Sequence, residues 1–247
     1  MAEFDNRVQQ GTRAATTAEI DVGLRAYMLK VYNYMLMALA LTGTTAWVIA
    51  NTSLASLFFA MNPVTHVYGL TVLGMVGVFA PLAFVLFLSM RIQSMSLATA
   101  QITFWLYSAV MGISIASILF AFTGESVARV FFITAATFGA MSLWGYTTKA
   151  DLSGMGSFLF MGLIGIIIAS VVNLFIASTM VQWVVSVVGV LVFVGLTAYD
   201  TQRIKESYSV GDDGTVAGKK AVMGALRLYL DFINLFLMLM QLLGNRR

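Results

Sequence analysis

Long apolar stretches follow one another along almost the whole 247-residue chain. A helix needs about 20 apolar residues to cross the hydrocarbon core of a bilayer. Stretches of about that length, separated by polar connections, cover residues 31–50, 68–90, 97–122, 127–145, 156–176, 181–200 and 222–243. The pattern therefore predicts seven transmembrane helices in an all-α, polytopic membrane protein that contacts the lipid bilayer.

The polar segments suggest how the chain is organised. The first 25 residues mix both charge signs without an apolar core, so we do not expect them to form a secretory signal peptide. We expect 1–29 to form an N-terminal cytoplasmic segment and 30–247 to form one seven-helix transmembrane domain. The longest internal connection, 201–221, contains several glycines and aspartates and is predicted to be a flexible polar loop.

Composition agrees with a membrane protein and excludes several other classes. Hydrophobic residues make up 60% of the chain and charged residues 10%, against about 25% charged in ordinary soluble domains. The net charge of +3 is too small and scattered for a nucleic-acid partner. The chain has no cysteine and one histidine, His66, which argues against thiolate chemistry, zinc sites and a Ser-His-Asp triad. We therefore expect no tightly bound cofactor.

The distribution of basic residues predicts the orientation in the membrane, because cytoplasmic loops carry the excess of Lys and Arg. A cytoplasmic N-terminus places all but three of the 14 basic residues on the cytoplasmic side. The three on the other side are Arg129, Arg246 and Arg247. Seven full spans are favoured, although a seventh segment that re-enters and returns would place the last two arginines in the cytoplasm. The expected location is the inner membrane of a cell, with the N-terminus cytoplasmic.

Two carboxylates fall at membrane depth, where ionisable groups are costly and tend to be functional. Asp200 ends the sixth apolar stretch, and Asp231 lies nine residues beyond the start of the seventh. A rise of 1.5 Å per residue places Asp231 about 13 Å along that helix. Because the sixth helix descends to the cytoplasmic face and the seventh starts from it, we expect the two carboxyl groups to meet.

The seventh segment also carries a polar stripe. Four of its polar residues fall on one helical face, at offsets of zero, four, seven and fourteen; they are Arg227, Asp231, Asn234 and Gln241. Lipid does not satisfy such groups, so this helix is predicted to lie inside the bundle.

Spacing alone leaves two interpretations of the aspartates open. In the first, each forms an ordinary salt bridge within its own helix, Asp231 with Arg227 and Asp200 with Arg203. In the second, Asp200 and Asp231 approach each other, share a proton and change protonation near physiological pH. The second arrangement is that of a proton sensor.

The strings GLTAYDTQRIK and LYLDFINLFLMLMQLLG, together with seven spans, resemble the Bax inhibitor-1 (transmembrane Bax inhibitor motif) family in its bacterial branch. The resemblance covers about 31–244 and leaves the segment to about Leu29 outside. It implies a pH-sensitive calcium leak channel whose closed state holds the seventh helix in the centre of the other six. It also implies that Asp200 and Asp231 are the di-aspartyl pH sensor and that Arg91, in FVLFLSMR, is a latch arginine.

The residues are compatible with calcium as a permeant ion. Calcium prefers six to eight oxygen ligands, usually including several carboxylates. The membrane interior offers only Asp200 and Asp231, assisted at best by Asn234, carbonyl groups and water. We therefore expect a weak calcium transit site and not a tight structural one.

Two other functions remain open. Tyr199 and Asp200 match the first half of an intramembrane aspartyl protease signature, but the Gly-x-Gly lead and the Pro-Ala-Leu tripeptide are absent. We therefore predict that the chain is not an enzyme. The resemblance to the bacterial branch of the family also implies a second alternative, an interaction protein that modulates a membrane-anchored quality-control protease through its N-terminal segment.

The charges predict how such a channel opens. A dyad with at least one negative charge binds Arg91, with Arg203 also nearby, and ties the second, sixth and seventh helices together. Acid protonates the pair and weakens this attraction, so the leak is expected to rise as pH falls.

Overall fold

The computed structural model describes residues 2–61 and 68–247, and within helix α1 the side chains from residue 21 onward. His66 lies outside the described residues. The helices are α1 (Ala2–Asn51), α2 (Ala55–Phe58), α3 (Val72–Arg91), α4 (Leu97–Ala121), α5 (Gly124–Thr147), α6 (Ser153–Ile176), α7 (Thr179–Glu206) and α8 (Gly214–Leu243), with strands β1 (Phe59–Met61) and β2 (Tyr68–Leu70).

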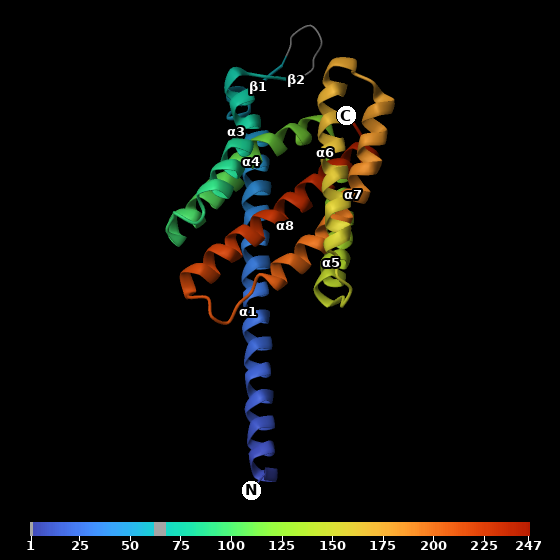
Figure 1. Ribbon diagram of the computed structural model, residues 1–247. Helices are drawn as coiled ribbons and strands as arrows, with labels where there is room; N and C mark the ends of the chain where they lie inside the picture. The colour runs from blue at the N-terminus through green and yellow to red at the C-terminus, as the bar shows by residue number, and fades with distance from the viewer. Residues whose placement is uncertain (1, 62–67) are drawn as a thin grey trace.

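The chain forms an all-α, polytopic membrane protein, as the apolar pattern predicts (Figure 1). Within the described residues, seven helices are long and apolar enough to cross a membrane; α2 is the short exception. Large apolar side chains are exposed along most of them, and α6 is the least buried span. Such an exterior suits lipid and not water.

Polar side chains begin most of the spanning helices. A hydroxyl or carboxylate at the N-cap accepts a hydrogen bond from an otherwise unpaired amide of the first turn. Asp213, for example, accepts from the Val216 amide at 2.7 Å and starts α8. The other capping residues of this kind are Thr71, Ser96, Thr123 and Ser178.

Helices α7 and α8 extend further than the apolar stretches that predicted them. The loop predicted over 201–221 is shorter than expected, because α7 continues to Glu206 and α8 begins at Gly214, which leaves 207–213 between the two helices. Apolar length marks only the part of a helix in hydrocarbon, whereas polar residues continue the same helix beyond it. Asp231 therefore lies near the middle of α8 and not in its first half.

A short hairpin between α2 and α3 was not predicted. Strand β1 pairs antiparallel with β2, with Phe59 opposite Leu70. The span predicted to begin at residue 68 therefore begins at Val72, after the second strand. Strands of three residues are too short to show a period of two in the sequence.

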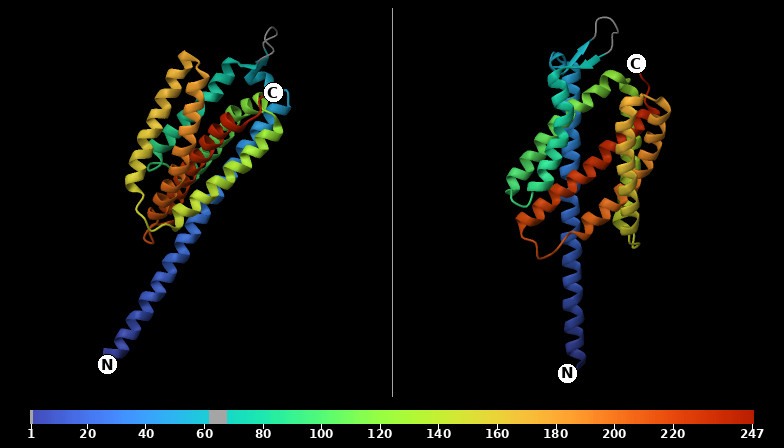
Figure 2. Two further views of the ribbon diagram at one scale, coloured as in Figure 1. Left: turned by 90° about the vertical axis from the view of Figure 1, so that its right-hand side faces the viewer. Right: turned by 45° about the horizontal axis from the view of Figure 1, so that its top comes forward.

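We call the end of the bundle at which α8 begins the N-side and the opposite end the C-side. Contacts between the connections define both ends. At the N-side, the Lys219 ammonium donates to the Gln93 carbonyl at 3.0 Å, so α8 starts beside the α3–α4 connection. At the C-side, the Thr123 amide donates to the Asn245 carbonyl at 3.0 Å, so the chain ends beside the α4–α5 turn. Figure 2 shows the two termini at opposite ends. Helix α8 therefore crosses the whole bundle, which is contrary to a re-entrant seventh segment.

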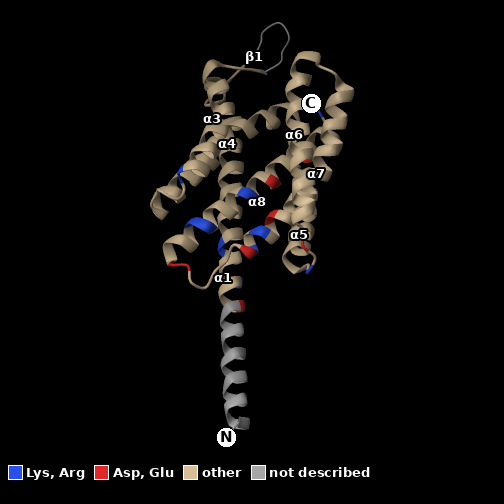
Figure 3. Ribbon diagram, in the orientation of Figure 1, with Lys and Arg blue, Asp and Glu red and all other residues tan. Residues whose placement is uncertain are grey.

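Charged side chains gather in the N-side half (Figure 3). Most of the described basic residues predicted to be cytoplasmic lie there. Arg129 stands near the start of α5, and Arg246 and Arg247 end the chain beside the α4–α5 turn, so these three lie toward the C-side. The assignment of the N-side to the cytoplasm stays a prediction. So does the division into 1–29 and 30–247, although α1 runs through that boundary without a break.

Helix α8 is the most buried of the spans, since 67% of its apolar 18-residue stretch is buried inside the protein. It packs against α1, α4, α5 and α7. Its residues Tyr229, Phe232 and Leu235 belong to the main apolar core, which these helices share. The expectation that α8 lies inside the bundle agrees with this burial, while a central position ringed by all six other spans stays a prediction.

Candidate functional site: a carboxyl pair between α7 and α8

The structure brings Asp200 and Asp231 together. Asp200 lies in the last turns of α7 and Asp231 in the middle of α8, and these two helices pack along much of their length. The two carboxyl groups are within hydrogen-bonding range of each other. The Asp231 side chain is buried, with 4% of the residue exposed, whereas 17% of the Asp200 side chain is exposed.

One carboxyl oxygen of this pair lacks a donor. Asp231 Oδ2 is fully buried, and no N–H or O–H group of the described residues donates to it. Two ionised carboxylates at this range repel each other. A single proton shared by the pair replaces that repulsion with an O–H···O hydrogen bond.

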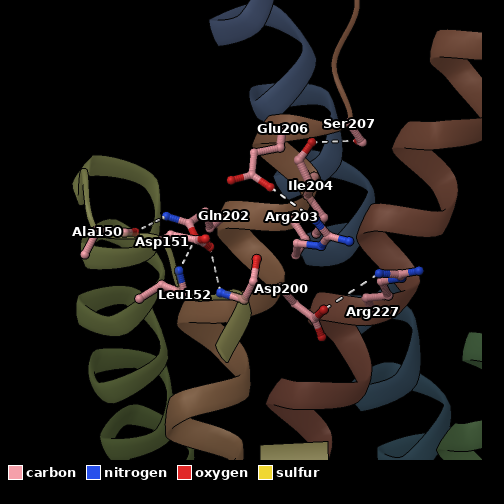
Figure 4. Close-up of polar contacts among 11 residues, drawn as sticks. Ala150, Asp151, Leu152, Asp200, Gln202, Arg203, Ile204, Glu206, Ser207 and Arg227 are labelled. Carbon is pink, nitrogen blue, oxygen red and sulfur yellow. Dashed lines mark hydrogen bonds and ion pairs between the residues drawn. The ribbon is translucent and has the colours of Figure 1, made fainter. Parts of the chain in front are cut away.

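Arg227 forms an ion pair with this site across the two helices. Its Nη1 lies 3.8 Å from Asp200 Oδ1 (Figure 4). Of the two interpretations that the sequence left open, the pairing of Arg227 with Asp231 within α8 is therefore contradicted. Arg227 stands one turn before Asp231, so the α7–α8 packing that joins the carboxyl groups also carries its guanidinium to Asp200.

The second expected pair within a helix is also wrong. Arg203 Nη1 lies 3.5 Å from Glu206 Oε2, one turn further along α7, and its ion pair is formed there and not with Asp200. Both side chains are about half exposed, at 50% and 48%. The positive charge of Arg203 nevertheless still acts on the Asp200 carboxylate at longer range.

The latch role assigned to Arg91 is not supported by this conformation. Arg91 is the last residue of α3 and is exposed. Among the described residues, none of the ion pairs involves Arg91, whereas Arg227 occupies the position expected of a latch. The resemblance pointed to an arginine at a helix end, but helix packing brings a different arginine to the dyad.

The polar residues of the α8 stripe form separate hydrogen bonds and not one continuous polar contact. Asn234 donates to the Leu230 carbonyl of its own helix at 2.8 Å. Gln241 accepts from the Gln182 side chain at 2.9 Å and from Arg246 at 3.3 Å, so it belongs to the C-side. A polar pocket of about 310 Å³ lies beside it, between α6, α7 and α8.

An apolar contact lies between Asn234 and Gln241. Met238 lies between Asn234 and Gln241 in the sequence of α8 and presses against α7, where a Cβ added to Gly189 would meet the Met238 side chain at 2.9 Å. The face of α8 that packs on α7 is therefore apolar at Met238, which also lines the C-side pocket.

The α7 turns that carry Asp200 are anchored by a residue that the sequence analysis did not single out. The side chain of Gln202 accepts from the Leu152 amide at 2.9 Å and donates to the Ala150 carbonyl at 2.8 Å (Figure 4). Gln202 is buried, and it ties the α5–α6 connection to the end of α7. In the sequence, the signal that points to Gln202 is its position two residues after Asp200.

The described residues offer few ligands for a tightly held metal. No group of three or more His, Asp or Glu side chains is close enough together in that part of the chain to hold an ion. Asp200 and Asp231 are two carboxylates with the Arg227 guanidinium beside them, far fewer oxygen ligands than the six to eight that calcium prefers.

The comparison with protein families identifies the chain. The sequence profile of a family described as "Inhibitor of apoptosis-promoting Bax1" matches residues 24–247. The chain belongs to the Bax inhibitor-1 family. The match begins before the predicted limit near residue 31, so the first turns of the α1 span belong to the family region as well.

Relatives of the Bax inhibitor-1 family align over nearly the whole chain. The Rickettsia prowazekii protein RP147 is 48% identical over 236 residues, which is 96% of each chain. The Escherichia coli inner membrane protein YbhL is 46% identical over 237 residues, covering 95% of this chain and 98% of that one. A Streptococcus pyogenes membrane protein is 36% identical over 226 residues, covering 91% and 95%.

Proposed function

We propose that this protein is a pH-sensitive calcium leak channel of the inner membrane, gated by Asp200 and Asp231. The observation that carries the proposal is the contact of two carboxyl groups at membrane depth, with one buried oxygen lacking a donor. A charged group in this position is costly and is seldom kept without a use. The inner-membrane name of the YbhL relative and the seven spans support the location.

The carboxyl pair acts as the sensor because its charge depends on pH. At neutral and alkaline pH at least one carboxylate is ionised and attracts Arg227, which joins α8 to α7. Protonation in acid removes that attraction and favours a conformation in which the two helices separate. A loss of about 1 kcal/mol, the upper limit for a partly exposed ion pair, raises a minor open population about fivefold. The expected sign is a larger leak at lower pH on the N-side.

Calcium is the cargo in this proposal and not a resident cofactor. The dyad supplies carboxyl oxygens at the point where α7 and α8 separate, and water supplies the remaining ligands. A weak site is suited to conduction because the ion must leave as readily as it enters. Met238 and the Gln182–Gln241 hydrogen bond lie on the C-side of the dyad, where α7 and α8 contact each other.

The direct test uses purified protein in liposomes that contain a calcium dye, with the external pH scanned from alkaline to acid. We expect calcium entry that grows as pH falls and that protein-free liposomes do not show. Equal calcium entry with and without protein, at every pH, would overturn the channel proposal.

The same preparation distinguishes a channel from a protease. Paired aspartates at membrane depth also occur in intramembrane proteases, but the residues before Asp231 are Leu228, Tyr229 and Leu230 instead of the Gly-x-Gly lead. We therefore expect no cleavage of a model transmembrane peptide under conditions where calcium leaks. Cleavage that disappears in Asp200→Asn would assign the dyad to catalysis instead.

A further inference from the structure

A long apolar groove lies between α1 and α5, and neither Asp200 nor Asp231 lines it. It has a volume of about 690 Å³, with walls formed by α1 residues 25–39 and α5 residues 131–146 and with Phe232 of α8 between them. At 1.5 Å per residue, each wall is about 21 Å long. Leu36 and Leu143 on its rims are 60% and 64% exposed, so the groove opens toward the surrounding membrane.

The N-side end of the groove differs from the rest because it is polar and basic. Arg25 lines this end and is exposed. The Lys205 ammonium lies close by, where it donates to the Tyr146 carbonyl at 2.8 Å and stands 5.2 Å from the centre of the Tyr146 ring. None of the residues that line the groove is acidic. Positive charge at one end of an apolar channel complements a phosphate joined to a hydrocarbon chain.

We propose that this groove binds a phospholipid, with the phosphate at Arg25 and an acyl chain along the apolar walls. Both walls belong to spanning helices, so the groove faces hydrocarbon over most of its length. Basic residues near the surface of a membrane attract anionic headgroups, and Arg25 lies in the first turns of the α1 span, which starts at Asp21. The length and volume are within the range of sites that enclose one elongated apolar ligand.

The bound lipid contacts residues that adjoin the dyad. Tyr32 and Ser142 line the groove and share a hydrogen bond of 2.6 Å, and Ser142 is joined to Thr201 at 2.9 Å. Thr201 follows Asp200 in α7, and Phe232 follows Asp231 in α8. The proposed site is therefore separate from the ion path but shares its supporting side chains.

The experiment measures how much lipid stays bound to the purified full-length protein. Phosphatidylglycerol is added to delipidated protein in detergent, and retention is counted by native mass spectrometry. A diacylglycerol with the same chains serves as the comparison that lacks phosphate. We expect the wild-type protein to retain phosphatidylglycerol and to release the diacylglycerol.

Two variants locate the site, each with a matched control. Gly139→Leu fills the groove, since a Cβ added at Gly139 meets nothing within 4 Å; Gly165→Leu, equally open on α6, is its control. Arg25→Gln removes the phosphate partner, with Arg91→Gln, exposed at the same end, as its control. Arg25→Gln should weaken retention roughly tenfold, the order of one charge-assisted contact. Gly139→Leu should weaken retention as well, because its side chain occupies the space of the acyl chain. The control variants should match the wild type.

Two results would overturn the proposal. Equal retention by Gly139→Leu and Gly165→Leu would mean that the acyl chain lies elsewhere. Equal retention of phosphatidylglycerol and diacylglycerol, unchanged in Arg25→Gln, would mean that no phosphate is recognised.

Discussion

At the scale of single residues, the identity of the arginine at the dyad matters most. Arg227 is placed at the ion-paired position by the structure, while the resemblance had indicated Arg91. The Arg227 side chain is 55% exposed and its ion pair with Asp200 is 3.8 Å long. A partly exposed pair of this kind contributes at most about 1 kcal/mol, because solvent screens it. The pair is therefore weak enough for protonation to release it.

This difference gives a prediction for two arginine variants. Arg227→Gln removes the contact that holds α8 to Asp200, so the calcium leak at alkaline pH should rise, by up to about fivefold for a loss of 1 kcal/mol. Arg91→Gln should leave the leak at the wild-type level. Dye-loaded liposomes at alkaline pH measure both. A rise in Arg91→Gln with no change in Arg227→Gln would restore the latch to Arg91.

At the scale of elements, α3 contains a proline in its interior that a neighbouring helix accommodates. Pro81 has no N–H, so the Gly77 carbonyl one turn earlier loses its usual donor. Ser114 of α4 donates to that carbonyl at 3.3 Å. The hydrogen bond links α3 to α4 at a depth where water is scarce.

Removing this donor should weaken the protein slightly. Hydrogen bonds between membrane helices are worth about 0.6 kcal/mol on average, so Ser114→Ala should lower the thermal midpoint by roughly 2 °C. Ser117→Ala, an exposed serine that bonds within α4, is the control. In a Pro81→Ala background the helix supplies its own donor, and Ser114→Ala should then cost nothing. The same loss in both backgrounds would refute this account of Ser114.

At the scale of the whole molecule, the crossing of α8 separates the two termini. The C-terminal residues lie against the α4–α5 turn, with Arg247 N donating to the Ala121 carbonyl at 3.1 Å. With most basic residues at the other end, the N-terminus should be cytoplasmic and the C-terminus not. A reporter fused after Arg247 should therefore read as non-cytoplasmic, and one at the N-terminus as cytoplasmic. Two cytoplasmic readings would favour the re-entrant seventh segment.

The sequence predicts the seven-span architecture well, but it predicts the side-chain contacts poorly. Seven apolar stretches are enough to predict seven spans, because the thickness of the bilayer fixes helix length. The ends of α7 and α8 and the β1–β2 hairpin are missed, since polar helix ends and three-residue strands carry no apolar signal. Spacing brings Asp200 and Asp231 to the same region, but whether Arg227 binds Asp231 or Asp200 depends on how α7 and α8 pack. The contacts of Gln202 and the groove at Gly139 likewise depend on how segments distant in the sequence pack together.

The central claim is that the Asp200–Asp231 pair is the pH sensor, and the pH dependence of calcium leak through Asp231→Asn tests it most directly. Asp151→Asn is the matched control, because Asp151 lies at the same end in the α5–α6 connection. Hydrogen bonds from the side chain and the amide of Ser153 lower the pKa of Asp151, so this carboxylate stays ionised throughout the neutral range. It therefore does not contribute to a pH response there.

In dye-loaded liposomes scanned from pH 8 to about pH 5, where sensors of physiological pH operate, the wild type and Asp151→Asn should leak more as the pH falls. Asp231→Asn should leak at a nearly constant rate, because its amide does not take up the proton. A wild-type pH response in Asp231→Asn would contradict the claim.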